Sequence, residues 1–115
     1  MSYELQKITS EDFQKYVLEP RLELTKLVLG HKHKEYSVDD DYLVNFTDGA
    51  RFDNTTPELT LWGYLKKQLV SVMKIAKNSP NQKYSKDFVK EKIGDCINYL
   101  ILLEAIMNCR DNNKS

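Results

Sequence analysis

The chain has 115 residues, of which 41% are apolar, and this is enough for one modest hydrophobic core and one domain. Seventeen basic side chains balance seventeen acidic ones, so no excess of positive charge marks a surface for long nucleic acid. The apolar run that begins at Cys96 is interrupted by polar residues and is shorter than the roughly 20 residues of a membrane span. We therefore expect neither a long nucleic acid nor a membrane as a partner.

The first predicted element is a helix that begins at the N-terminal side of the chain, with Thr9 or Ser10 as its N-cap. Two acidic residues follow the cap, where they suit the positive end of a helix dipole. Pro20 lacks a backbone N–H and disfavours helical geometry in the residue before it. We therefore expect a kink or break near Pro20, followed by a second helical stretch to about Lys34.

The second predicted helix is short and carries the apolar residues Leu43, Val44 and Phe46. It follows an acidic run, and any of Asp39 to Asp41 could cap it. Metal ligation is the other interpretation of this run, because carboxylate oxygens are ligands for hard cations.

The third predicted helix has the clearest start signal of the chain. Thr55 or Thr56 stands at the N-cap position and Pro57 at the first helical position, and the pattern continues to about Lys77. At about 100° per residue, one face gathers six residues that we expect to form the core side. These are Trp62, Leu65, Leu69, Val72, Met73 and Ala76.

The fourth predicted helix follows Ser85, which can cap it, and runs to about Arg110. Residues 110–115 are polar, and we expect them to form a disordered tail. Four principal helices without an alternating strand pattern predict an all-α four-helix bundle in a single domain, residues 1–115. Because Leu100 to Leu103 is apolar on every side of the helix, several helices or a second subunit must cover it. We therefore predict a homo-oligomer.

A polar stripe runs along this apolar last helix, formed by Glu91, Asp95 and Asn98 at helical spacing. Glu91 and Asp95 are four residues apart, a spacing that lets two carboxylates hold one divalent cation. Further metal ligands would have to come from Glu35 or from Asp39 and its neighbours. In the structural alternative, Glu91 is at the surface in a salt bridge with a lysine, and Asp95 is buried and paired with Lys67 or Tyr36.

Lysines and aromatic residues suggest a second kind of chemistry. Lys66 and Lys67 could hold phosphates, and Trp62 or Tyr36 could stack on a base, although a solvated lysine edge beside a core tryptophan explains the same pattern. Asp95 and Asn98 would then contact a sugar or base. The predicted ligand-binding set is Tyr36, Asn45, Trp62, Lys66, Lys67, Asp95, Asn98 and Tyr99.

The two cysteines indicate the redox compartment of the protein. Cys96 and Cys109 lie thirteen residues apart in one predicted helix, roughly 20 Å along its axis, so they cannot form a disulfide with each other there. No secretory signal and no cysteine framework is visible. We expect a protein of the reducing cytoplasm.

Three segments carry a resemblance to a known family: KHKEYSVDDDYLVNF, LWGYLKKQLVSVMKI and EKIGDCINYLILLEAIM. They resemble a family of small phage and prophage proteins over about residues 27–107, which implies the cytoplasm of an infected bacterial host. That family is distantly similar to the all-α MazG-like nucleoside triphosphate pyrophosphohydrolases, helical oligomers that bind nucleotides through Mg²⁺. Glu91 and Asp95 match the acidic positions of their later helix.

The chain departs from the MazG pattern in the earlier helix, where those enzymes supply a Glu-Glu pair and a further Glu one turn on. In place of that acidic set, this chain has only Glu19 and Glu23 around Pro20, or Glu35 alone. We therefore predict a protein without catalytic residues or cofactor that sequesters a nucleotide-derived ligand. By analogy, this is the role of phage sponges for cyclic nucleotide or cyclic ADP-ribose-type signals. The alternative is a Mg²⁺-dependent pyrophosphohydrolase with Glu35, Asp39, Glu91 and Asp95 as metal ligands.

Overall fold

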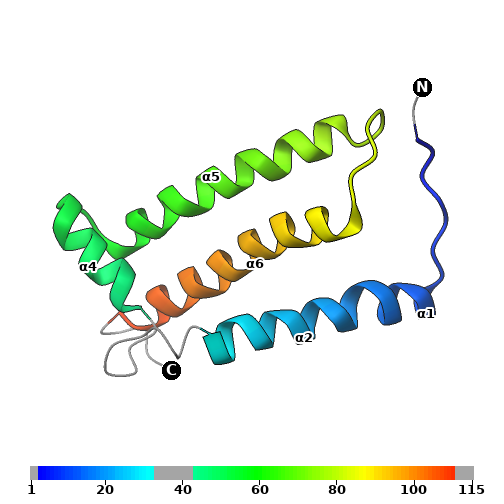
Figure 1. The fold of residues 1–115 in the computed structure, drawn as a ribbon. Coiled ribbons are helices and arrows are strands. Elements are labelled where there is room, and N and C mark those ends of the chain that lie inside the picture. The colour runs from blue at the N-terminus through cyan, green and yellow to red at the C-terminus, as the bar shows by residue number, and fades with distance from the viewer. Residues whose placement is uncertain (1–2, 33–42, 111–115) are drawn as a thin grey trace.

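The computed structural model describes residues 3–32 and 43–110, and all regular structure in these ranges is helical. A continuous N-terminal helical stretch is followed by α4 (Val44–Asp53), α5 (Pro57–Asn78) and α6 (Lys86–Asn108) (Figure 1). The predicted all-α class and the four helices are confirmed for these residues. Among them, no helix is both long and apolar enough to cross a bilayer.

The N-terminal stretch stays helical through Pro20. It consists of α1 (Ser10–Phe13), a π-helical turn (Gln14–Leu18), α2 (Glu19–Leu27) and a second π-helical turn (Val28–Lys32). Pro20 stands in the first turn of α2, and the N–H of Glu19 donates to the carbonyl of Gln14, five residues back. The helix therefore accommodates Pro20 through the wider π-helical turn that precedes it, and the predicted break does not occur.

Three helix starts follow their predicted caps. The Oγ1 of Thr9 accepts a hydrogen bond from the N–H of Asp12 at 3.0 Å. Thr56 caps α5 and Ser85 caps α6 in the same way, at 3.2 and 3.1 Å. These short polar side chains satisfy backbone donors that have no partner inside the helix.

The start of α4 differs from the prediction. Leu43 occupies its N-cap position and supplies no side-chain hydrogen bond. The acidic run Asp39 to Asp41 lies outside the described residues. The helix ends at Asn54, whose left-handed backbone (φ 55°, ψ 50°) turns the chain toward α5.

The core lies between α5 and α6, which are joined by a short loop and run side by side, with α4 packed across one end (Figure 1). Leu61 and Leu65 of α5 are fully buried at its centre. Their buried neighbours are Phe46 and Ala50 from α4 and Cys96, Leu102 and Ile106 from α6. At the α4 end, the guanidinium of Arg110 bonds Glu58 (Nε to Oε2, 2.8 Å), so the first residue of the predicted tail is held against α5.

The buried face of α5 is rotated from the predicted one. Leu65 is buried as expected, but Trp62, Leu69 and Met73 are 45%, 39% and 60% exposed. Two apolar stripes run along α5, and the packing against α6 selects the one that contains Leu61.

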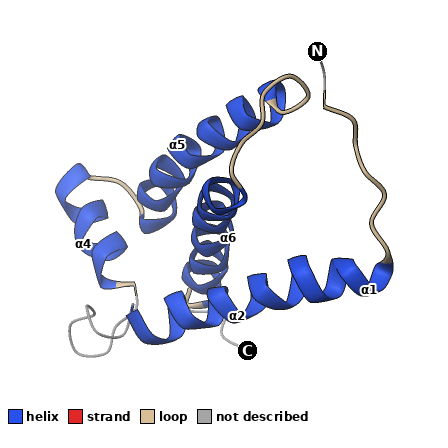
Figure 2. Cartoon of the chain, turned by 45° about the vertical axis from the view of Figure 1, so that its right-hand side comes forward, coloured by secondary structure: helices blue, strands red, loops and turns tan. Residues whose placement is uncertain are grey.

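The N-terminal stretch packs more loosely than the other helices. Its main contacts are those of α2 with α6, with Leu29 of the second π-helical turn packed against the core, and no described residue from Ser10 to Gly30 is buried. The preceding segment runs back toward the α5–α6 loop, where the N–H of Tyr3 donates to the carbonyl of Pro80 (Figure 2). Space is therefore left between α2 and α6.

Candidate functional site

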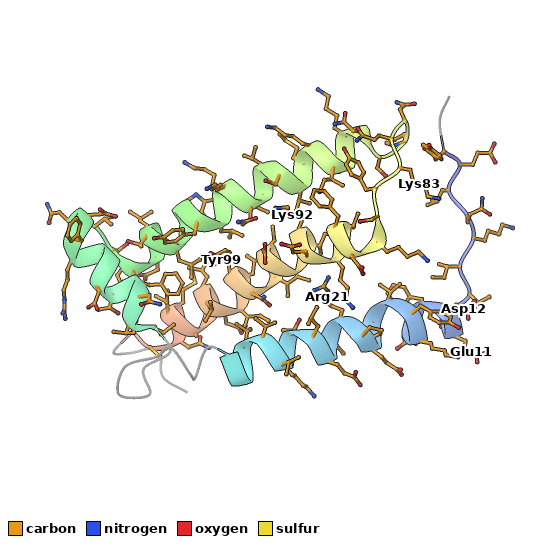
Figure 3. All side chains as sticks on the ribbon, viewed as in Figure 1. Glu11, Asp12, Arg21, Lys83, Lys92 and Tyr99 are labelled. Carbon is orange, nitrogen blue, oxygen red and sulfur yellow. The ribbon has the colours of Figure 1, made fainter. Side chains whose placement is uncertain are left out.

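A cavity of about 270 Å³ lies between α2 and α6. Figure 3 shows Arg21 reaching into this space from α2 toward α6. The lining residues are Arg21, Leu24, Thr25 and Val28 from α2, and Asp87, Lys90, Glu91, Gly94, Asp95 and Asn98 from α6. Their spacing of three and four residues places each set on a single face of its helix. The predicted polar stripe of α6 is one wall of this cavity.

Two polar atoms of the cavity lack a hydrogen-bond partner. The Oγ1 of Thr25 and the Oδ1 of Asn98 are buried, and neither has a partner among the described residues. Leaving a buried polar group without a hydrogen bond costs about 1–3 kcal/mol. The cavity therefore favours an occupant, water or ligand, that donates a hydrogen bond to the amide oxygen of Asn98 and pairs with the hydroxyl of Thr25 as donor or acceptor.

The side chain of Arg21 reaches from α2 to the backbone of α6. Its Nη2 donates to the carbonyl of Lys90 at 2.7 Å. A Cβ added at Gly94 would stand 2.5 Å from Nη1 and 3.4 Å from Cζ of Arg21. Glycine inside a helix costs roughly 0.5–1 kcal/mol relative to alanine, and here it lets the guanidinium approach the backbone.

Acidic groups outnumber basic groups in the cavity. The carboxylates of Asp87, Glu91 and Asp95 stand against the cations Arg21 and Lys90. Among the described residues, the ion pairs are Arg51 with Asp48 and Arg110 with Glu58, and neither lies in the cavity. The charges of the cavity are therefore available to an occupant.

Tyr99 lies on a different side of α6, toward α5 (Figure 3). Its ring stacks on Tyr64 with centroids 6.2 Å apart and planes inclined by 10°, and Phe46 meets Tyr64 edge-on at 6.4 Å. Burial, with the nearby charge of Asp95, raises the pKa of Tyr99 above its ordinary value. Tyr99 is part of an aromatic cluster that joins α4, α5 and α6, and does not line the cavity.

The other predicted site residues are dispersed. Trp62, Lys66 and Lys67 are exposed on α5, and Asn45 is exposed on α4; none of them lines the cavity. Tyr36, Glu35 and Asp39 lie outside the described residues. Of the predicted set, the structure brings together Glu91, Asp95 and Asn98.

The described residues give a partial fit for a divalent cation. Glu91 and Asp95 share one face of α6, but no group of three or more His, Cys, Asp or Glu side chains gathers at a metal-binding distance in residues 3–32 and 43–110. Mg²⁺ bound by two carboxylates takes its remaining ligands from water or substrate.

Sequence reasoning missed seven of the ten lining residues, among them Arg21, Thr25 and Asp87. Asp87 lies one turn before Glu91 and extends the same stripe, so helical spacing alone could have included it. Gly94, inside a long apolar helix, was a further signal, because such a glycine often marks a close approach by another group. Comparison of the chain with protein-family models, with curated proteins and with solved structures finds no match.

Proposed function

We propose that this protein is a non-catalytic binder that sequesters a small nucleotide-derived ligand in the cavity between α2 and α6. One observation carries the proposal: two buried acceptors, on Thr25 and Asn98, lack a partner beside the carboxylate of Asp95 in a preformed cavity. Small-molecule sites combine apolar walls with a few such convergent polar groups.

The composition of the cavity suits one nucleoside unit. Leu24 and Val28 offer apolar surface to a flat ring, and Asp95 and Asn98 offer acceptors to a sugar or base. The guanidinium of Arg21 can pair with a phosphate oxygen. A volume of about 270 Å³ lies near the lower end of the usual range for ligand pockets, roughly 300–1,000 Å³. The small volume and the excess of carboxylates favour a ligand with few phosphates.

Calorimetric titration tests the proposal with nucleosides, nucleotides, cyclic oligonucleotides and cyclic ADP-ribose derivatives. At least one ligand should bind, and Asn98→Ala should weaken binding while Asn81→Ala, the same change in the exposed α5–α6 loop, leaves it unaltered. A sponge should also release an ultraviolet-absorbing small molecule when protein purified from cells is heat-denatured. No heat of binding with any member of the panel would refute the proposal.

The second candidate is a Mg²⁺-dependent pyrophosphohydrolase of the MazG type. The observation that favours it is the presence of Glu91 and Asp95 side by side in the cavity wall. Pyrophosphate release from nucleoside triphosphates with Mg²⁺, abolished by Asp95→Asn, would select this activity over sequestration.

We also propose that a second copy of the chain covers the exposed apolar surface of α5 and α6. Twenty large hydrophobic side chains are exposed among the described residues, whereas seven hydrophobic residues are buried. On α6, Ile93 and Leu100 are 39% and 50% exposed one heptad apart, as on helices that pack against another helix. Eleven of these twenty exposed side chains lie on α5 and α6.

Light scattering coupled to size-exclusion chromatography tests this assembly. Leu100→Asp should shift the mass toward that of a monomer, because it places a charge in the proposed interface. Leu5→Asp is the matched control, since Leu5 is 99% exposed in the N-terminal segment. A monomeric wild-type protein would refute self-association.

A further inference from the structure

The hydrogen-bonding side chains that line the cavity include Asp95, Asn98 and Thr25, beside the cations Arg21 and Lys90. Asp95 and Asn98 are three residues apart on α6, so their side chains are neighbours on one face. Thr25 faces them from α2, and its hydroxyl oxygen, like the amide oxygen of Asn98, has no partner among the described residues. Arg21, a donor in the same wall, already gives one N–H to the carbonyl of Lys90. The Asp95 carboxylate and the amide oxygen of Asn98 therefore favour donors on the ligand, whereas the Thr25 hydroxyl can pair with a donor or an acceptor.

We propose that the cavity binds the donor edge of a guanine-type base, an inference that rests on the proposed function. Guanine presents its ring N1–H and exocyclic 2-amino group side by side, and both can donate to the two oxygens of the Asp95 carboxylate. The second amino hydrogen is then available to the amide oxygen of Asn98. Leu24 and Val28 supply apolar contacts for the ring.

The other bases fit this wall less well. Adenine and cytosine present one amino group beside a ring nitrogen that accepts hydrogen bonds, and uracil places its single N–H between two carbonyl oxygens. When any of these three bases is placed against the Asp95 carboxylate, one of its own acceptor atoms faces a carboxylate oxygen, and no hydrogen bond can form there. The mismatch leaves a buried polar group unpaired, which is the strongest way for a site to reject a related ligand.

Titrations of the full-length wild-type chain with four nucleoside monophosphates test the inference. Guanosine monophosphate should bind most tightly. Inosine monophosphate lacks the 2-amino group, 1-methylguanosine monophosphate lacks the N1–H, and adenosine monophosphate lacks the paired donors. Each of the three should bind at least roughly tenfold more weakly, the expected effect of one lost hydrogen bond to a charged group.

A variant series adds a test from the side of the protein. Asp95→Asn replaces one acceptor oxygen by a donating amide, so the preference for guanosine over inosine monophosphate should fall to less than threefold. Asp53→Asn makes the same change at the exposed end of α4 and should keep the preference. If Asp95→Asn fails to fold, as judged by circular dichroism, the wild-type ligand series alone decides.

The outcomes separate this inference from the proposed function. Equal binding of guanosine and inosine monophosphates would overturn the donor-edge assignment and leave nucleotide sequestration standing. If a ligand without a guanine-type donor edge bound most tightly, the donor-edge assignment would again be overturned and nucleotide sequestration would stand. Absence of binding across all nucleotides and signals would overturn both.

Discussion

The contact between Arg21 and Gly94 makes a prediction about stability that can be worked out in sign and size. Gly94→Ala adds a methyl group whose three nearest neighbours all belong to the Arg21 side chain, at 2.5, 3.4 and 3.7 Å. The guanidinium must therefore leave its position, and its hydrogen bond to the carbonyl of Lys90 is lost. In the same substitution α6 gains helix propensity.

Two opposing terms set the magnitude. Alanine is more favourable than glycine by about 1 kcal/mol inside a helix. The hydrogen bond from Arg21 contributes about 1.5 kcal/mol, the lower end for charged donors, because the bond lies near the surface. Gly94→Ala should thus destabilise the wild-type protein by about 0.5 kcal/mol, but stabilise the Arg21→Ala variant by about 1 kcal/mol. The coupling between the two positions is then about 1.5 kcal/mol.

Urea denaturation of the four proteins of this double-mutant cycle measures the coupling. All four must be compared at one protein concentration, since an oligomer gains stability with concentration. Equal effects of Gly94→Ala in both backgrounds would refute the reasoning, because they would mean that the alanine methyl does not displace Arg21.

Three further predictions concern other parts of the fold. Leu65→Ala should lower the free energy of unfolding by about 2–5 kcal/mol, measured by urea denaturation, because Leu65 is fully buried. The hydrogen bond from Arg110 lowers the pKa of Glu58 from 4.5, so the ion pair stabilises the fold above that pH and loses its effect as the pH falls through the lowered value. Arg110→Ala should therefore cost up to about 1 kcal/mol at pH 7 and progressively less below pH 4.5, whereas a constant cost would exclude this titration. Burial raises the pKa of the Cys96 thiol, so alkylation followed by mass spectrometry should modify the exposed Cys109 roughly tenfold faster; equal rates would contradict the burial.

Three of the ten residues that line the cavity could be predicted from the sequence. Glu91, Asp95 and Asn98 were recognisable because a polar stripe on an apolar helix has a local, periodic signature. Arg21 and Thr25 were not, because nothing in the sequence indicates which face of the N-terminal helix turns toward α6. In the sequence, Lys66 and Lys67 look as suitable for ligand binding as Glu91, Asp95 and Asn98 do. Packing alone leaves the two lysines exposed on α5 and outside the cavity.

Three helix starts and the all-α class follow from the local chemistry of the chain. Thr9, Thr56 and Ser85 act within one turn of their own positions, and a cap of this kind needs no distant partner. The choice between competing apolar faces depends on tertiary contacts: α5 has two such faces, and α6 buries the one with Leu61 and Leu65. The cavity is likewise a product of packing, because its two walls come from helices that are far apart in the chain, α2 ending at Leu27 and α6 beginning at Lys86.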